Sequence, residues 1–195
     1  MEPPRKKLHR REAYLQSRFL TFSCFGRLPL LKNPKIADEM AACLERARLR
    51  RGFRLIAWVI MPEHVHLLMV PKPVESDGRV RVSVPSLLMA IKRPLAATVL
   101  ERWRQANWQG LSRLRDAEGE ARFWQPGGGF DRNVRDAEEY AKTIEYIHQN
   151  PVERGLVAAT TDYRWSSARA YAGIDDGLVH VDQVKHGEPW DWRND

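Results

Sequence analysis

Cysteine is scarce in this chain of 195 residues, which contains only Cys24 and Cys43. Two isolated cysteines form neither a CxxC pair nor the dense framework of a disulfide-rich domain, so structural zinc and a disulfide scaffold are both disfavoured. Long apolar runs are missing as well, because the strongest one, from Leu55 to Met61, is far too short to span a bilayer. The basic first residues are not followed by the apolar stretch of a signal peptide. These absences predict a soluble protein of the reducing cytoplasm, with no membrane segment.

Acidic residues are outnumbered by basic ones. Lys and Arg number 32 against 25 Asp and Glu, which gives a formal net charge of +7 and a pI of about 9.7. This excess favours an anionic partner such as nucleic acid or an anionic membrane surface. The proportions of hydrophobic residues (43%) and charged residues (29%) are those of a folded globular domain rather than a disordered chain.

The two ends of the chain differ in charge. No internal repeat divides the sequence, and its length fits a single domain. We expect this domain over residues 1–174, opening with a basic arm, and an acidic tail over residues 175–195. The tail has a local net charge of −4, from Asp175, Asp176, Asp182, Glu188, Asp191 and Asp195 against Lys185 and Arg193. It could fold back over a basic groove and weaken the binding of an anionic partner, or act only as a solubilising tail.

Apolar periodicity and turn residues predict the order of the elements. A strand over residues 19–25 precedes a helix from Pro34 to Gly52, two strands over 55–61 and 65–70, and a loop over 72–85. A helix over 87–103, with a kink or later start at Pro94, then precedes a loop with a short strand and a third helix, capped by Asp136 and stopped by Asn150-Pro151. The order predicts an α+β fold of the ferredoxin-like, split βαβ kind, with an antiparallel sheet and helices on one face.

Two histidines stand on the second of the paired strands. His64 and His66 are two residues apart, so their imidazoles project from the same face of the predicted sheet. That geometry suits two ligands of one metal ion, whereas the ordinary alternative is a pair of surface or core histidines. A metal site needs a third ligand from elsewhere in the chain.

The third helix offers polar candidates by its periodicity. At about 100° per residue, the predicted buried stripe centres on Ile144 and includes Ala137, Tyr140, Ala141, Ile147 and His148. Tyr146 and Asn150, one turn apart, leave this stripe and share an outward face. Taken alone, Tyr146 is also typical of a partly exposed helix aromatic, and Asn150 before proline of a helix C-cap.

Four segments stand in one order along the chain: FLTFSCFGRLPLL, AWVIMPEHVHLLMVP, FWQPGGGFDRNVRDAEEYAKTIEYIHQNPVERGLV and DYRWSSARAY. In combination they resemble the REP-associated tyrosine transposases, relatives of the single-tyrosine HUH transposases of small insertion sequences. The resemblance covers roughly residues 12 to 172. It implies a ferredoxin-like domain whose last helix carries the catalytic tyrosine.

The resemblance also implies a set of site residues. His64 and His66 would be metal ligands, Tyr146 the nucleophile and Asn150 a third ligand. Tyr140 and Tyr146 diverge by about 240° around the helix, which favours one nucleophilic tyrosine over two. A free tyrosine has a pKa of about 10 and is a poor nucleophile at neutral pH, so a divalent cation would have to polarise the scissile phosphate. Imidazole suits Mn²⁺ and oxygen ligands suit Mg²⁺, so either metal is possible.

The implied reaction is metal-dependent cleavage and rejoining of single-stranded DNA, and the implied substrate is a palindromic hairpin such as a REP-type repeat. Attack by Tyr146 would give a 5′-phosphotyrosine link and a free 3′-hydroxyl. The protein, as a monomer or a homodimer, would lie at the bacterial nucleoid when bound to DNA. The alternatives are a domesticated, non-catalytic nucleic-acid-binding protein and a metal hydrolase that uses water as its nucleophile.

Contacts to DNA are harder to assign from residue type. The candidates for phosphate contacts are Arg10, Arg11, Lys92, Arg93 and Arg132. Trp108, Trp124 and Phe130 are candidates for stacking on unpaired bases. Each residue singly is also typical of a solvated helix face or a packed core.

Overall fold

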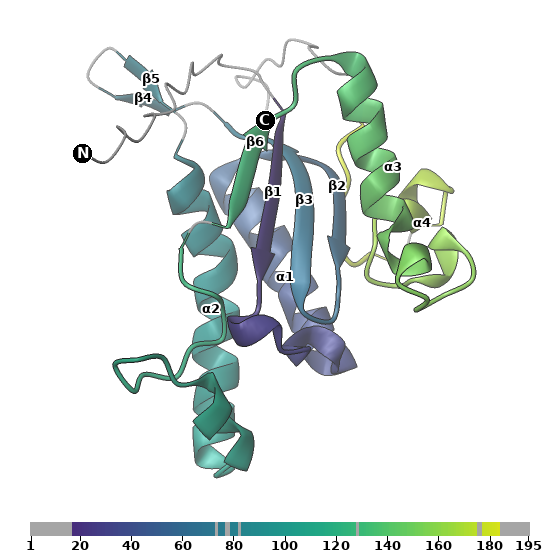
Figure 1. The fold of residues 1–195 in the computed structure, drawn as a ribbon. Coiled ribbons are helices and arrows are strands. Elements are labelled where there is room, and N and C mark those ends of the chain that lie inside the picture. The colour runs from purple at the N-terminus through teal and green to yellow at the C-terminus, as the bar shows by residue number, and fades with distance from the viewer. Residues whose placement is uncertain are drawn as a thin grey trace, which may run out of the picture.

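Four strands form an antiparallel sheet in the order β2-β3-β1-β6 (Figure 1). They are β1 (Arg18–Ser23), β2 (Arg54–Ile60), β3 (His64–Val70) and β6 (Phe130–Asn133). This computed structural model describes residues 17–72, 74–76, 79–81, 83–127, 129–174 and 177–183. Helix α1 (Pro34–Arg51) connects β1 to β2, which lie on either side of β3 in the sheet. Helix α2 (Val84–Gln105) stands between β3 and β6 in the chain, and these two strands lie on either side of β1 in the sheet. This is the predicted split βαβ arrangement, and the α+β fold class is confirmed.

Helix α1 (Pro34–Arg51) forms where its capping residues predict it. The side chain of Asn33 accepts a hydrogen bond from the backbone N–H of Lys35, and Pro34 occupies the first turn, where its missing N–H costs nothing. Gly52 ends the helix at φ +63°, a left-handed conformation that favours glycine. The local sequence therefore determines both ends of this helix.

The two faces of the sheet pack against different helices. Side chains alternate along β3, so Val65, Leu67 and Met69 enter the core beneath α1 and α2, while Leu68 and Val70 enter a second core. That second core lies beneath α3 (Ala137–Glu153). The predicted placement of helices on one face thus holds for α1 and α2, and α3 covers the opposite face.

The segment predicted as a loop over 72–85 contains a small two-stranded hairpin, β4 (Val74–Ser76) and β5 (Arg79–Arg81). Helix α2 (Val84–Gln105) then begins earlier than predicted and runs through Pro94 as one helix. A proline inside a helix costs about 3 kcal/mol. The buried row of Leu87, Leu88, Ile91, Leu95 and Val99 offsets that cost, so the predicted later start is wrong.

The predicted stop of α3 at Asn150-Pro151 is also wrong, because the helix continues to Glu153. Pro151 lacks only its own N–H, and the carbonyls around it are still paired. The N–H of Arg154 donates to the backbone carbonyl of Asn150, and the N–H of Leu156 donates to the backbone carbonyl of Pro151. Asp136 caps the other end as predicted, accepting from the N–H of Glu139.

Residues 163–167, the Tyr-Arg-Trp-Ser-Ser part of the DYRWSSARAY segment, cover the outer edge of β2. The N–H of Ile60 donates to the carbonyl of Trp165, and the N–H of Ser167 donates to the carbonyl of Trp58. The Tyr163 hydroxyl adds a hydrogen bond to the carbonyl of Ile60. The short helices η4 (Thr160–Asp162) and α4 (Ala168–Tyr171) flank this segment. An exposed strand edge is an aggregation hazard, so this part of the motif has a structural role.

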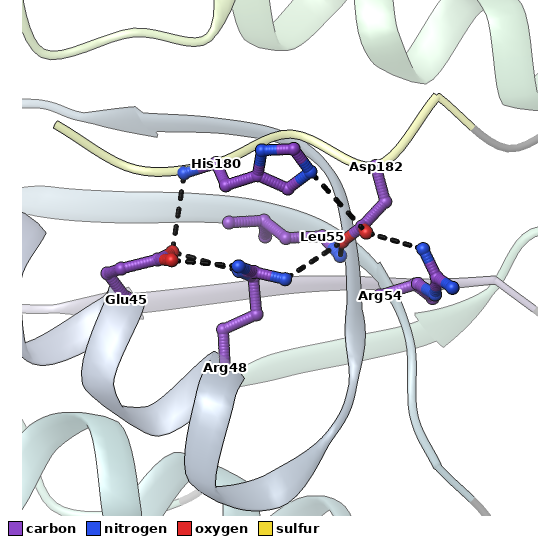
Figure 2. Close-up of polar contacts among 6 residues, drawn as sticks. All are labelled: Glu45, Arg48, Arg54, Leu55, His180 and Asp182. Atoms are coloured by element: carbon purple, nitrogen blue, oxygen red, sulfur yellow. Dashed lines mark hydrogen bonds and ion pairs between the residues drawn. The ribbon is translucent and has the colours of Figure 1, made fainter. Parts of the chain in front are cut away.

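Residues 177–183 continue the cover of β2 from the stretch predicted as an acidic tail. Asp182 is 4% exposed and pairs by both its backbone and its side chain with the backbone of Leu55 (Figure 2). Its carboxylate also lies 2.7 Å from the guanidinium of Arg54 and 3.6 Å from that of Arg48. The other five acids of the predicted tail lie outside the described residues.

Three further 3₁₀ helices complete the list of elements: η1 (Phe25–Arg27), η2 (Leu30–Lys32) and η3 (Gln109–Leu114). Within the described ranges, no helix combines the length and the apolar character that a membrane crossing requires.

Candidate active site

The two histidines of β3 face each other at their Nε2 atoms, which lie 2.9 Å apart. Their outer nitrogens are held by neighbouring residues. The Nδ1 atom of His64 is 3.2 Å from the carboxylate of Glu63, and the Nδ1 atom of His66 is 2.7 Å from the hydroxyl of Thr21 on β1. One proton arrangement satisfies all three contacts: Thr21 donates to His66, His66 to His64, and His64 to Glu63.

Burial keeps this pair uncharged. It lowers the pKa of His66 to about 3, and the neighbouring His64 acts in the same direction. Burial also lowers the pKa of His64, although the Glu63 carboxylate opposes the shift. Neutral imidazole is the form that binds a metal ion, and both Nε2 atoms become available once the proton between them moves to Nδ1 of His66, where the hydroxyl oxygen of Thr21 can accept it.

Tyr146 on α3 lies beside the histidine pair. Its ring centroid is 5.3 Å from that of His66 and 6.0 Å from that of Phe19, which stacks on His66 at 5.4 Å. Tyr146 is 43% exposed, in agreement with the helical periodicity. The fold therefore brings a solvent-accessible phenol next to two neutral imidazoles from a strand some 80 residues earlier in the chain.

Asn150, one turn after Tyr146, corrects the predicted helix face. It was expected to point outward with Tyr146, but it is 6% exposed. The buried row of α3 consists of Tyr140, Thr143, Ile147, Asn150 and Pro151, and Ala137 and Ala141 are exposed. Thr143 is responsible for part of this rotation, because its hydroxyl donates to the carbonyl of Glu139 and is buried at little cost.

The side-chain oxygen of Asn150 is buried without a hydrogen-bond partner in the described structure. A buried acceptor left unpaired costs about 1–3 kcal/mol, which makes it a candidate ligand position. Among the described residues, at this site or elsewhere, no group of three His, Cys, Asp or Glu side chains could hold a metal ion, so a third ligand here has to be of another kind. The donor set of two imidazoles and one amide oxygen fits a divalent cation, and Glu63 and Thr21 supply the outer hydrogen bonds that usually orient such histidines.

Of the predicted DNA-contact residues that the structure describes, Lys92 and Arg93 lie together on α2, whereas Arg132 lies on β6. Lys92 is half-buried against the rings of Phe22 and Trp124, and Arg93 is exposed on the outer side of α2. Arg132 lies on β6 over the ring of Phe19 and forms an ion pair with Glu139, close to Tyr146. Arg10 and Arg11 lie outside the described residues.

The predicted stacking aromatics also separate. Trp124 is buried, and its indole N–H donates to the carbonyl of Lys92, so it is a core residue rather than a stacking platform. Trp108 is partly exposed and packs against Trp103. Phe130 is 52% exposed, and its ring lies 6.0 Å from that of Phe19, beside the histidine–tyrosine cluster.

Three neighbours of the histidines were not singled out from the sequence. Glu63 pairs with both His64 and Arg154, at 3.2 and 2.8 Å. Its place directly before the histidine pair was a usable signal. Thr21 and Phe19 reach His66 only through the register of β1 on β3, in which Thr21 pairs with His66. That register is not visible in a single sequence.

Comparison with known proteins gives one family name repeatedly, although no family model matches the chain. The REP-associated tyrosine transposase of Escherichia coli K12 is 25% identical over 145 residues, which cover 74% of this chain and 66% of that protein. A Haemophilus influenzae protein with the same family name is 29% identical over 116 residues, covering 59% of this chain and 58% of that protein. The chain thus matches less than two thirds of the length of either curated relative.

A solved structure has the same fold. A REP-associated tyrosine transposase bound to a REP hairpin superimposes with a TM-score of 0.58 at 20% identity, over 97% of this chain and 95% of that one. The sheet and helices therefore define an α+β protein of the split βαβ class. Within that class, the sequence matches confirm the resemblance to the REP-associated tyrosine transposases.

Proposed function

We propose that this protein is a metal-dependent, tyrosine-mediated endonuclease and strand transferase that acts on single-stranded, hairpin-forming DNA such as REP-type repeats. The position of Tyr146 beside the neutral His64–His66 pair is the observation that carries this proposal. The names of the relatives and the REP hairpin bound to the structural neighbour support it.

Tyr146 is the proposed nucleophile. Its phenolic oxygen attacks the scissile phosphorus, forms a new O–P bond and displaces the 3′-oxygen, which leaves as a hydroxyl with the proton that the phenol gives up. The DNA strand is then held through its 5′-phosphate on the tyrosine. Because one phosphodiester replaces another, the reverse attack by a 3′-hydroxyl can rejoin strands without an external energy source.

His64, His66 and Asn150 are the residues that would hold a divalent cation, either Mn²⁺ or Mg²⁺. When bound, such an ion supplies positive charge that polarises the scissile phosphate. Glu63 and Thr21 orient the two imidazoles, and Arg154 holds Glu63 in place through their ion pair.

The surroundings of Tyr146 suit an unpaired strand. Phe130 presents an exposed aromatic ring at the sheet edge, where a base could stack, and Arg132, two residues on, lies over the ring of Phe19 and is ion-paired with Glu139. Gly129 precedes Phe130 at φ +71°, and a Cβ there would lie 2.0 Å from the carbonyl oxygen of Thr21. Glycine is therefore required for β6 to approach β1 at this point.

The test incubates purified protein with labelled hairpin oligonucleotides from the flanks of its own gene, in Mn²⁺ or Mg²⁺. A covalent protein–DNA band on a denaturing gel is expected, and it should disappear in Tyr146→Phe and in His64→Ala. Tyr140→Phe is the matched control, because it removes a hydroxyl from a buried tyrosine of the same helix and should keep the band. Metal-dependent cleavage without a band would indicate a hydrolase instead, and binding without cleavage would indicate a non-catalytic binding protein.

A further inference from the structure

A hydrogen bond between two side chains joins α3 to the segment that covers β2. The Nε2 atom of His148, two residues after Tyr146, lies 2.8 Å from the hydroxyl oxygen of Ser167. Ser167 is 1% exposed, and the same hydroxyl oxygen lies 2.9 Å from the backbone nitrogen and 3.2 Å from the carbonyl oxygen of Trp58 on β2. One residue of the covering segment therefore contacts both the tyrosine helix and the edge strand of the sheet.

The three contacts use the hydroxyl of Ser167 completely. It donates to the carbonyl of Trp58, and it accepts from the N–H of Trp58 and from the Nε2–H of His148. A serine hydroxyl has one proton and two lone pairs, so this arrangement leaves no capacity for a substrate. Because Ser167 is also buried, the pair does not form a second catalytic dyad.

Both residues belong to segments that the sequence analysis singled out, and the proposed reaction uses neither side chain. His148 stands in the Tyr-Ile-His-Gln-Asn-Pro part of the third segment, from which the reaction takes Tyr146 and Asn150. Ser167 ends the Tyr-Arg-Trp-Ser-Ser part of the fourth segment, whose backbone covers β2. That cover explains the backbone contacts of this part, but not a serine side chain bonded to α3.

The other contacts of α3 determine its position along the sheet less precisely. Its buried row packs in the second apolar core, and apolar packing is non-directional. Ion pairs join Glu139 to Arg132 near one end of the helix and Arg154 to Glu63 at the other. Both arginine side chains are exposed, and solvent screens such pairs. The hydrogen bond of His148 differs because it has a defined length and direction and ends on a buried group.

The surroundings of His148 connect it to β2 a second time. The ring of Tyr171 on α4 lies edge-on to the imidazole, with centroids 4.9 Å apart, and its hydroxyl donates to the carbonyl of Ile56 at 3.1 Å. Helix α4 lies beside the C-terminal end of α3 (Figure 1). Ser167 and Tyr171 are thus both bonded to the backbone of β2, so the imidazole is held relative to that strand.

A displacement of α3 along β2 would reach the active site directly. Trp58 precedes Val59, which pairs with His66 in the register of the sheet. Tyr146 and His148 belong to one continuous helix. The hydrogen bond therefore joins the helix of the proposed nucleophile to the strand next to the proposed metal ligand. Misplacement of a reacting group by about 1 Å can lower a rate by about 100-fold.

We propose that His148 is a positioning residue, whose hydrogen bond to Ser167 fixes α3 along β2. The bond thereby sets the distance of Tyr146 from the two histidines of β3. The inference rests on the proposed function, because it assigns a further residue of α3 to the same reaction. His148 acts through the helix and not on the DNA.

The test compares variants that remove the hydrogen bond with one that keeps it. His148→Leu removes the donor and keeps a good helix former, whereas His148→Gln retains a side-chain N–H donor. Ser167→Ala removes the acceptor. Gln149→Leu is the matched control, since it makes a similar change at the next position of α3 without removing the contact to Ser167.

Initial rates of covalent adduct formation are measured per folded molecule over a range of DNA concentrations. His148→Leu and Ser167→Ala should each lower the maximal rate by about 10- to 100-fold, with no change in the DNA concentration that gives half of it. The double variant should lose no more than either single variant, because the same contact is removed in all three. His148→Gln should retain most of the rate, and Gln149→Leu all of it. Equal losses in His148→Leu and His148→Gln, or an effect on the half-maximal DNA concentration alone, would overturn the proposal.

A second measurement separates this proposal from the proposed function. In the DNA-free protein, the ring protons of Tyr146 and His66 should show a nuclear Overhauser effect, because the ring centroids are 5.3 Å apart. We expect this signal to weaken in His148→Leu and to return in His148→Gln, whether or not the protein cleaves DNA. A missing covalent band in the unmodified protein would contradict the nicking activity, whereas an unchanged Overhauser effect in His148→Leu would contradict the positioning role.

Discussion

The two faces of the sheet use the same strands for opposite purposes. Toward α1 and α2, the central strand buries Val65, Leu67 and Met69 in an apolar core. Toward α3, the same strand presents His64 and His66 beside a partly exposed tyrosine. Neutral buried histidines and an unpaired amide oxygen are costly, and such costs are tolerated where the rest of the fold is stable. The difference teaches that one face is an apolar core alone, whereas the other combines a second apolar core with polar groups that are costly to bury.

Substitutions at two neighbouring residues of β3, one on each face, provide the strongest test of this difference between the faces. We expect His66→Gln to reduce formation of the covalent adduct by at least about 100-fold, because a proposed metal ligand is lost, while the free energy of unfolding changes by less than about 1 kcal/mol. Leu67→Ala should do the reverse: it should lower the free energy of unfolding by about 2–5 kcal/mol and leave adduct formation per folded molecule unchanged. Urea unfolding and initial rates of adduct formation measure both quantities. If Leu67→Ala also slowed the folded enzyme, the two faces would not be independent.

The packing of residues 177–183 extends the stabilising face to the edge of β2. Asp182→Ala should lower the free energy of unfolding by about 3 kcal/mol, because it leaves Arg54 without its buried carboxylate and frees the N–H of Leu55. Thermal and urea unfolding of Asp182→Ala, compared with a chain that ends after Gln183, provide the measurement. The truncated chain retains Asp182 and should have the same free energy of unfolding as the full chain. If Asp182→Ala and the truncated chain lost the same amount of stability, a specific role for this carboxylate would be contradicted.

Phe130 tests whether the opposite face holds unpaired bases. Phe130→Ala should weaken binding of a single-stranded oligonucleotide by about 1–3 kcal/mol, the cost of losing one stacked base, and Phe130→Trp should restore it. Fluorescence titration in the Tyr146→Phe background separates binding from cleavage. Leu156→Ala is the control, since it removes another exposed apolar side chain. Equal weakening in the control would mean that Phe130 does not stack.

Tyr163 shows that the α3 face also contains a purely structural group. Tyr163→Phe should lower the free energy of unfolding by about 1 kcal/mol at neutral pH, through loss of the hydrogen bond to the carbonyl of Ile60. Burial raises the pKa of Tyr163 to about 12, and the charge of Glu63 acts in the same direction. In the unfolded chain, the hydroxyl of this tyrosine has a pKa of about 10. The stability that the neutral hydroxyl contributes is therefore present below about pH 10 and is lost as the pH rises towards 12.

The free energies of unfolding of the unmodified protein and of Tyr163→Phe, measured between pH 7 and 11, test the direction of this pH dependence. The advantage of the unmodified protein over Tyr163→Phe should shrink as the pH rises, because phenylalanine does not ionise. An advantage that stayed constant over this range would contradict the raised pKa. Adduct formation should be the same in both proteins at neutral pH.

Local signals predicted the elements well where one residue decides the outcome. Pro34 and Gly52 mark the two ends of α1, and Asp136 caps α3, because capping depends on the nearest few residues. Proline was less decisive. Pro94 and Pro151 both lie inside helices, since buried contacts on the neighbouring turns outweigh one missing hydrogen bond.

The arginines of α1 illustrate what a linear pattern conceals. In the sequence, Arg46, Arg50 and Arg51 belong to a run of arginines that is typical of a solvated helix face. Arg48, in the same run, is paired with Glu45 and Asp182, whereas the others line a groove with Arg93 of α2. Which arginines are neutralised depends on contacts between elements distant in the chain.

The sequence by itself determined the order of the four strands of the main sheet and of helices α1 to α3. It also determined the shared face of His64 and His66 and the exposure of Tyr146, because backbone periodicity dictates which side chains point together. The tertiary structure alone decided that Tyr146 lies against His66 and that Asn150 is buried with its oxygen unpaired. Those outcomes depend on how α3 is rotated on the sheet. That rotation is set by the combined packing of Tyr140, Thr143 and Ile147, and periodicity within one helix does not specify it.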